Sequence, residues 1–324
     1  MVFKRLLGSL GVGGPTVDTV LSPGPTLPGG TLSGEVRLQG GDAAFDIEQI
    51  TLELVAGVEA EHTEEESEGT VVFDRFTVGG GFRLAEGEER TVPFGVTLPW
   101  ETPVTELYGQ ELGIVLGLRT ELSVAGAKDR GDLDRLNVTP RPAQEAILEA
   151  FGQLGFGFTS ADLELGRIGG TAQQLPFYQE LELTPSAEYA HAVNEIELTF
   201  LAAPAGMEVV LEADKRAGIL SSGDDALARF TVSHEGVGHQ DWNTVVDGWV
   251  RQLVEHRESY DPEAAYGHDR HERSAVGAGT AVGAGVAGLA VGVVGGLVAA
   301  EVVDEVGDFF EGEEAEEGEE AEEG

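Results

Sequence analysis

The sequence predicts a mainly β protein made of two tandem antiparallel β-sandwiches, followed by a C-terminal helix, a Gly/Ala-rich hydrophobic segment and an acidic tail. Apolar and polar residues alternate over short stretches, as in half-buried strands. Turn-rich clusters such as PGPTLPGG and GGDAA separate these stretches, and no helical pattern lies between them. One helical stretch in the middle of the chain divides the strands into two blocks, which favours two stacked-sheet domains.

Residues 1–140 are predicted to form the first sandwich, because a period of two runs through most of them. In the stretch GEVRL, Val36 and Leu38 alternate with charged residues. The alternation continues in EQITLELVA, RTVPFGVTLP and GIVLGLRTELSV. The acidic run EHTEEESEG at 61–69 predicts a long solvated hairpin loop. Its carboxylates lack the ordered spacing of a calcium-binding loop.

A connecting helix is predicted over 141–155, where apolar residues recur at helical spacing and Pro142 suits a first turn. Strands resume after it, and residues 156–240 are predicted to form the second sandwich. Its strands are expected in DLEL, FYQELELTP, EIELTFLAA, GMEVVLEAD and ARFTVSH. Both blocks share alternating strands with proline-marked ends, which is compatible with a structural duplication.

An amphipathic helix is predicted over 241–257, with Asp241 as its N-cap. Its apolar stripe contains two tryptophans and consists of Trp242, Val246, Trp249, Val250 and Leu253. Two interpretations remain open. The stripe seals the open side of the second sandwich, or Trp242, Trp249 and Leu253 bind a partner protein.

The C-terminal region divides into a linker at 258–274, an uncharged segment at 275–300 and an acidic tail at 301–324. As a helix, 275–300 would be about 39 Å long, enough to cross a bilayer core of about 30 Å. Its small residues Gly288, Gly292 and Gly296 recur every four positions, which allows close helix packing. Nine Val and Leu residues make membrane insertion marginal. Three alternatives remain open for this segment: it packs on protein, including a second copy in a homo-oligomer, it enters a membrane, or it is disordered. The acidic tail is predicted to be disordered and to keep the protein soluble.

The charge balance predicts a protein adapted to a salt-loaded cytoplasm. There are 59 acidic and 19 basic residues, a net charge of −40 and no cysteine. At molar salt the Debye length falls to about 3 Å, which screens this self-repulsion. An ordinary acidic protein is the alternative. Nucleic-acid binding is not expected, because no cluster of Lys and Arg could neutralise phosphates.

Sequence motifs for catalysis, a metal or a cofactor are weak. In HEGVGH, His234 and His239 are five positions apart, whereas the metalloprotease motif places its histidines four apart. His268 and His271 in HDRHER could ligate a metal only if the predicted linker were ordered. We therefore expect no enzyme, no metal site and no cofactor. The basic, apolar N-terminus lacks a clear signal-peptide cleavage pattern and is expected to pack on the first domain.

An ordered set of strand motifs resembles the sporulation-control proteins of the stage-zero M type. The motifs are FKRLLGSLGVGGPTVDTVL, GEVRLQGGDAAFDIEQITLEL, VPFGVTLP, FYQELELTP and NEIELTFLAAPAGMEVVLEADKRAG, and the resemblance covers about residues 1–235. It implies two arrestin-like sandwiches, no known enzymatic activity, and a cytoplasmic regulatory role linked to sporulation control and to cell-cycle or cytoskeletal proteins.

Together these observations predict a non-catalytic, cytoplasmic arrestin-like scaffold or regulator. It would bind protein partners through sandwich edges or through the cleft between the domains. The alternative is a membrane-tethered adaptor, anchored by 275–300.

Overall fold

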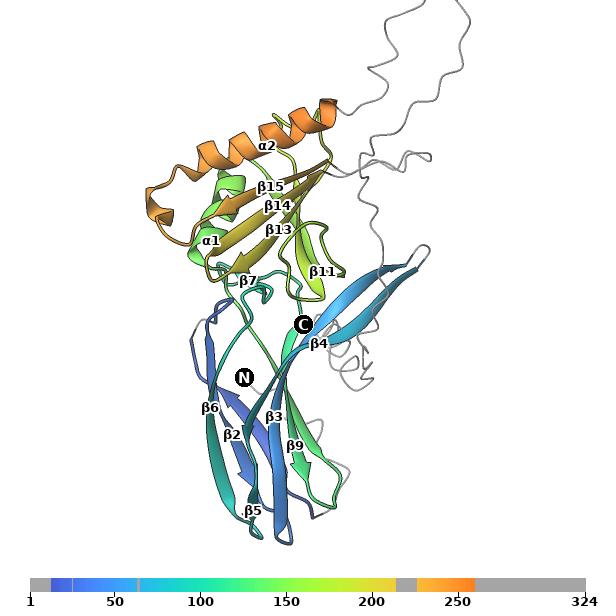
Figure 1. Ribbon diagram of the computed structural model, residues 1–324, viewed down its shortest axis with the longest axis vertical. Coiled ribbons are helices and arrows are strands. Elements are labelled where there is room, and N and C mark those ends of the chain that lie inside the picture. The colour runs from blue at the N-terminus through green and yellow to red at the C-terminus, as the bar shows by residue number, and fades with distance from the viewer. Residues whose placement is uncertain (1–12, 25, 63–64, 214–225, 260–324) are drawn as a thin grey trace, which may run out of the picture.

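The computed structural model describes residues 13–24, 26–62, 65–213 and 226–259 (Figure 1). The predictions for the N-terminal residues 1–12, the uncharged segment with Gly288, Gly292 and Gly296, and the acidic tail lie outside these residues. The same holds for His268 and His271. None of the described helices is both long enough and apolar enough to span a bilayer.

The first module stacks two antiparallel sheets, as the alternating pattern predicts (Figure 1). One sheet has the order β1-β2-β6, formed by Thr16–Leu21, Thr31–Gln39 and Glu89–Thr97. The other has the order β10-β9-β3, formed by Arg130–Arg135, Leu116–Val124 and Phe45–His62. On the other side of β3 lie β4 (Glu65–Gly79) and β5 (Phe82–Leu84).

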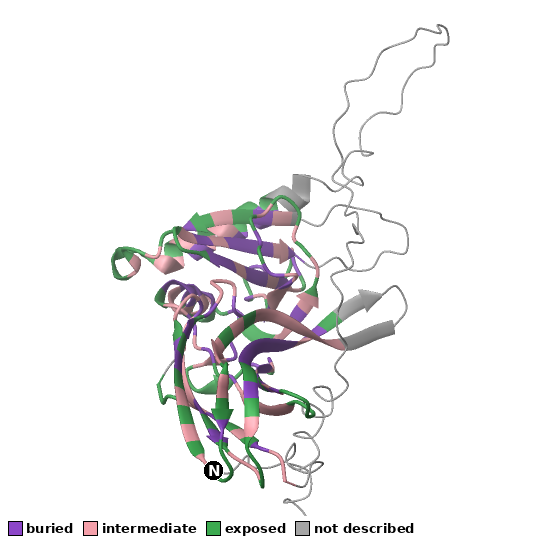
Figure 2. Cartoon of the chain, turned by 60° about the horizontal axis from the view of Figure 1, so that its bottom comes forward, coloured by how far each residue is buried: buried purple, intermediate pink, exposed green. Residues whose placement is uncertain are grey.

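Side chains of both sheets meet in the core of this module. Val36 and Leu38 of β2 are buried, as are alternate residues of β3 such as Leu52 and Leu54. Buried positions alternate with more exposed ones in β2, whereas residues 50–56 of β3 are all buried (Figure 2). The period of two is therefore confirmed as a burial pattern in β2, while this part of β3 is buried on both faces.

The acidic run at 61–69 is mostly strand, so the predicted long hairpin loop is wrong. Strand β3 continues to His62 and β4 starts at Glu65, with Glu59 opposite Glu68 in the register. Continued backbone pairing explains the difference, since a ladder can extend through residues whose side chains are all polar. The β3–β4 hairpin forms an arm beyond the first module (Figure 1).

The second module has one five-stranded antiparallel sheet in the order β11-β12-β13-β14-β15. Its strands are Gly157–Leu165, Phe177–Thr184, Ile196–Ala203, Gly206–Ala213 and Ala226–Val232. A single parallel bridge between Glu164 and Glu59 joins β11 to β3. The mainly β class with antiparallel sheets is confirmed.

Two helices cover one face of this sheet in the described part of the chain. Helix α2 (Trp242–Ser259) packs on β14 and β15, and α1 (Pro142–Gln153) packs on α2, β11 and the 3₁₀ turn η1 (Val237–His239). The described layer opposite the sheet is thus helical, where the sequence predicted a second stacked sheet. Helix α1 buries Ile147 and Phe151 in this core, so it does more than connect the modules.

Candidate partner-binding site

The predicted aromatic stripe of α2 faces the sheet. Leu253 is 0% exposed, and the Trp249 ring stacks on Phe230 of β15 with 4.8 Å between ring centroids. Trp242 is half-buried, and its indole Nε1 donates to the carbonyl of Val237 at 2.9 Å. The structure therefore favours the sealing role for Trp249 and Leu253. Trp242 alone of the three also lines a surface groove.

The N-cap prediction for α2 is confirmed. The Asp241 carboxylate accepts hydrogen bonds from the Thr244 backbone N–H at 3.2 Å and from its hydroxyl at 2.8 Å. These hydrogen bonds lower the pKa of Asp241. Helix α1 begins with Pro142 in its first turn, as predicted, and the Gln144 side chain accepts from the Arg141 backbone N–H at 2.8 Å.

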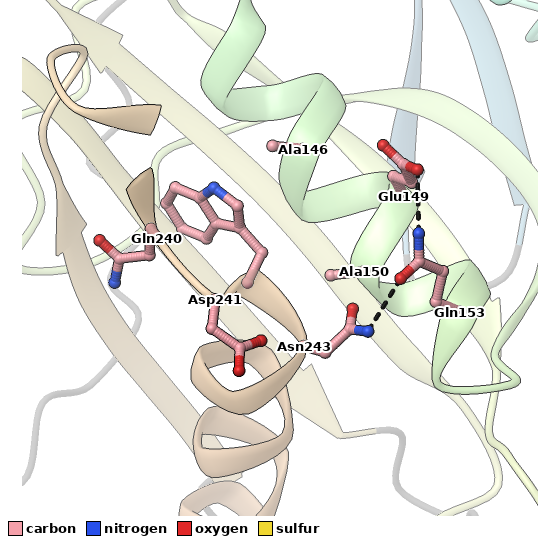
Figure 3. Close-up of a pocket in the computed structure, with 8 residues that line it drawn as sticks. Ala146, Glu149, Ala150, Gln153, Gln240, Asp241 and Asn243 are labelled. Atoms are coloured by element: carbon pink, nitrogen blue, oxygen red, sulfur yellow. Dashed lines mark hydrogen bonds between the residues drawn. The ribbon is translucent and has the colours of Figure 1, made fainter. Parts of the chain in front are cut away.

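A groove of about 260 Å³ lies between α1 and the start of α2 (Figure 3). It is lined by Ala146, Glu149, Ala150, Gln153, Gln240, Asp241, Trp242 and Asn243. The Gln153 amide donates to Glu149 at 2.9 Å and accepts from Asn243 at 2.8 Å, so one polar chain links the two helices. Because these helices are far apart in the sequence, spacing alone could not have predicted the groove.

Tyr108 is an exposed aromatic residue that the sequence reasoning missed. It is the first of two residues that join β7 (Glu106–Leu107) to β8 (Gln110–Glu111). The residue is 64% exposed, and its φ of +53° is the one positive φ among the described non-glycine residues. This backbone region costs about 1–2 kcal/mol for a residue with a side chain. Two-residue hairpins favour Asn-Gly there, so a Tyr-Gly turn was not an evident signal.

Strand β4 has a free edge in the described part of the chain. It pairs with β3 along one side, from Glu65 to Gly79, and no described strand pairs with its other side. A row of backbone N–H and C=O groups on such an edge can accept an extended segment of another protein. The edge is 15 residues long, longer than most strands in globular proteins.

Specific contacts fill the junction between the modules. The Gln179 side chain accepts from the Val104 N–H at 2.9 Å and donates to its carbonyl at 2.8 Å. Glu101 accepts from the backbone N–H groups of Gln174 and Leu175, each at 2.8 Å. These hydrogen bonds tie the two modules together at the cleft that was predicted as one of two surfaces for partner binding.

His234 lies at the same junction. Its ring stacks on Trp100 of the first module, with 5.2 Å between ring centroids, and its Nε2 lies 2.7 Å from the Ala203 carbonyl. Trp100 also carries the Arg141 guanidinium 4.3 Å from its ring centroid. His234 thus has a packing role, while His239 is an exposed residue of η1.

Carboxylates form an acidic ladder on the face of the second sheet that points away from α2. Glu182, Glu197 and Glu212 lie directly opposite one another on β12, β13 and β14, and Asp162 lies opposite Glu180. Burial first, then the charge of Glu197 and other carboxylates, raises the pKa of Glu180 to about 9. Burial and then Glu182 raise the pKa of Asp162 to about 6.

Two residues of the acidic ladder, together with the nearby Glu164 of β11, meet the geometric requirement for a metal group. Carboxylate oxygens of Asp162, Glu164 and Glu180 lie within 4.8 Å of one another. Oxygen ligands of this kind suit hard cations. Because the pKa values of Glu180 and Asp162 are raised, protonation of these two carboxyl groups relieves part of the repulsion among the neighbouring carboxylates. The sequence could not single out this trio, because acidic residues occur throughout the chain.

We expect Glu180→Gln to stabilise the protein at alkaline pH. In the folded protein the pKa of Glu180 lies above its ordinary value of 4.5. The stability that protonated Glu180 contributes is therefore complete below about pH 4.5, and it is lost as the pH rises through the folded-state pKa of about 9. One pKa unit corresponds to about 1.4 kcal/mol. At pH 9 the variant should therefore gain at least about 1 kcal/mol in free energy of unfolding, and the gain should shrink towards pH 4.5.

Denaturant unfolding across this pH range measures the effect of Glu180→Gln. The exposed Glu86 in a turn of the first module provides a matched control, and Glu86→Gln should leave the pH profile unchanged. Parallel profiles for the Glu180 variant and the wild type would contradict the prediction.

The fold defines the class of this protein: it is a mainly β protein of two modules, in which one edge of β4 pairs with no described strand. The family model described as SpoOM protein matches residues 3–217. The chain is 37% identical over 216 residues to the sporulation-control protein spo0M of Bacillus subtilis, covering 66% of this chain and 81% of that protein. The crystal structure of Spo0M from Bacillus subtilis matches with a TM-score of 0.66 and 30% identity, covering 76% of this chain and all of that chain. The chain belongs to the SpoOM protein family.

Proposed function

We propose that this chain is a non-catalytic regulator of the sporulation-control type, which works in the cytoplasm and binds a protein partner along the free edge of β4. The observation that carries the proposal is that one side of β4 pairs with no strand among the described residues. An incoming strand would satisfy its backbone groups, and alternate side chains would supply specificity. The relative from Bacillus subtilis is named for sporulation control and not for a reaction.

The position of β4 supports this proposal. Phe73 of β4 packs edge-on against Phe177 of β12 at 5.5 Å, so the strand contacts both modules. Binding along β4 would therefore act on the junction between them as well as on the first module. Such a contact gives a regulator a means of sensing how the modules are held together.

Adjacent proline substitutions test the β4 edge. Consecutive N–H groups of a strand point to opposite sides. One of the two variants Thr70→Pro and Val71→Pro therefore removes an N–H that faces β3, and the other removes an N–H that faces outward from the sheet. The outward variant should keep the circular dichroism spectrum and unfolding midpoint of the wild type, because proline is tolerated at an edge.

Crosslinking and capture from native cells in molar salt then compares this folded variant with the wild type. We expect the wild type to capture a specific protein partner and the folded proline variant to lose at least about 90% of it. Undiminished capture by the folded variant would rule out the β4 edge as the binding surface.

A second candidate function is that of a membrane-tethered adaptor. The uncharged sequence at 275–300, which lies outside the described residues, favours it. Pelleting with membranes in high salt that requires 275–300 and is lost in detergent would support this function. A protein that stays in the supernatant would support the untethered regulator.

A further inference from the structure

The two sheets of the first module meet along a seam between their edge strands β1 and β10. Among the described residues these two strands share no backbone ladder, and side chains hold them together. The Asp132 carboxylate of β10 accepts a hydrogen bond from the Thr19 backbone N–H of β1 at 2.6 Å. Beside it, the buried hydroxyls of Thr19 and Thr120 lie 2.7 Å apart. Asp132 therefore fastens the first described strand to the opposite sheet.

A second carboxyl group, that of Asp134, lies on the same face of β10 as Asp132, because alternate residues of a strand share a face. A hydrogen bond joins the two carboxyl groups. Ionised carboxylates only accept hydrogen bonds, so this bond requires a proton on one of the two. The Oδ2 atom of Asp134 is buried and has no hydrogen-bond partner among the described residues. An ionised Asp134 would therefore place an uncompensated charge in a buried position.

Strands β1 and β2 add charges on one side of the Asp132–Asp134 pair. On β1, Asp18 acts on both carboxyl groups with its negative charge. On β2, Arg37 stands opposite Asp18 in the register and forms an ion pair with Glu35. The charge that reaches the pair from this side is thus negative, and it adds to the repulsion when both carboxyl groups are ionised.

Strands β9 and β10 supply little positive charge near Asp134. The β9 residues that stand opposite the pair are Leu118 and Thr120, which are uncharged. Arg130 shares the face of the pair on β10, but it is four residues from Asp134, about 13 Å along a strand. Its guanidinium lies against Gly14, where an added Cβ would come within 2.4 Å of it. A proton is therefore the positive charge closest to hand for the pair.

The pH range of this proton follows from the surroundings of the pair. Burial first, then the negative charges of Asp132 and Asp18, raise the pKa of Asp134 to about 7. Burial also raises the pKa of Asp132, while the hydrogen bond from Thr19 lowers it in part. Because the folded-state pKa of Asp134 lies above its ordinary value of 3.8, the stability that its proton contributes is complete below about pH 3.8. It is lost as the pH rises through about 7.

We propose that Asp132 and Asp134 form a proton-controlled latch on the β1–β10 seam, closed when the two carboxyl groups share a proton and open when they do not. In the open state the carboxylates of Asp18, Asp132 and Asp134 repel one another across the seam. Salt screens partly buried charges less than exposed ones, so the latch works in molar salt as well. Its opening presents the edge of β1 to solvent. This inference goes beyond the proposed function and does not depend on binding at β4.

Hydrogen–deuterium exchange of the full-length protein, measured by mass spectrometry in about 1 M KCl, tests the latch. Exchange rates at pH 6 and pH 9 are divided by the rates of unstructured peptides at the same pH. The protection of the peptide that covers β1 should fall at least about tenfold between the two pH values. The peptide that covers β9, an inner strand of the same module, should keep its protection within about twofold. Equal protection of β1 at both pH values would overturn the proposal.

Two variants show whether the carboxyl pair is the group that titrates. In Asp134→Asn the amide donates to Asp132 at every pH, so β1 should stay protected at pH 9 within about twofold of its value at pH 6. Asp132→Asn still accepts from the Thr19 N–H and should flatten the pH profile in the same way. Asp46→Asn changes an exposed carboxylate of β3 and is the matched control, expected to behave as the wild type does. A tenfold loss of protection that persists in both Asp134→Asn and Asp132→Asn would refute the latch.

Discussion

Leu253→Ala is expected to lower the free energy of unfolding by about 2–5 kcal/mol, and Trp249→Ala by about 3–5 kcal/mol. Leu253 is 0% exposed, and Trp249 stacks on Phe230 of the sheet. Truncating either side chain leaves a cavity between α2 and the sheet that the two layers cannot close fully. Losses of this size follow if the stripe seals the second module.

Denaturant unfolding measures these losses, with Gln252→Ala as the control. Gln252 is the neighbouring residue on the exposed side of α2, and its substitution should change stability by less than about 0.5 kcal/mol. If Trp249→Ala and Leu253→Ala were equally mild while partner capture was lost, the stripe would be a binding surface after all.

Glu53→Gln is expected to cost about 3 kcal/mol, since breaking a buried ion pair leaves charges without a partner. Glu53 is 0% exposed although it lies on β3 opposite the face that packs in the sandwich. It faces Arg75 of β4 and Arg119 of β9 across the register. The Nε of each arginine donates to one of its carboxylate oxygens at 2.6 Å.

The matched control for Glu53→Gln is Glu35→Gln, which removes an exposed ion pair with Arg37 on β2. Exposed pairs contribute about 0–1 kcal/mol and are screened by salt. In molar salt the effect of Glu35→Gln should vanish, and most of the effect of Glu53→Gln should remain. Equal losses for the two variants would show that Glu53 does not act as a buried junction of three strands.

Features that depend on neighbouring residues were predictable from the sequence. Asp241 caps α2 because its carboxylate reaches an N–H only three residues ahead. The α2 stripe was predictable because residues three or four apart share one face of a helix. The alternation in β2 and β3 identified apolar residues that are buried in the first module, such as Val36 and Leu52, but not the buried Glu53.

Features that depend on how distant segments meet were not predictable. Glu53 is 22 residues from Arg75 and 66 from Arg119, and only the strand register brings them together. The acidic ladder likewise depends on which carboxylates stand opposite one another on β11–β14. A shift of one residue in either register would have turned these side chains to the other face.

Local periodicity in the chain was thus sufficient for its mainly β class, for most of its strands and helices, and for their apolar buried residues, because these follow from side-chain direction along a single element. Tertiary packing decided that helices cover the second sheet and that no strand in the described part of the chain pairs with the outer edge of β4. Those outcomes depend on register and docking between segments far apart in the chain, where many pairings bury similar apolar area and specific contacts select one of them.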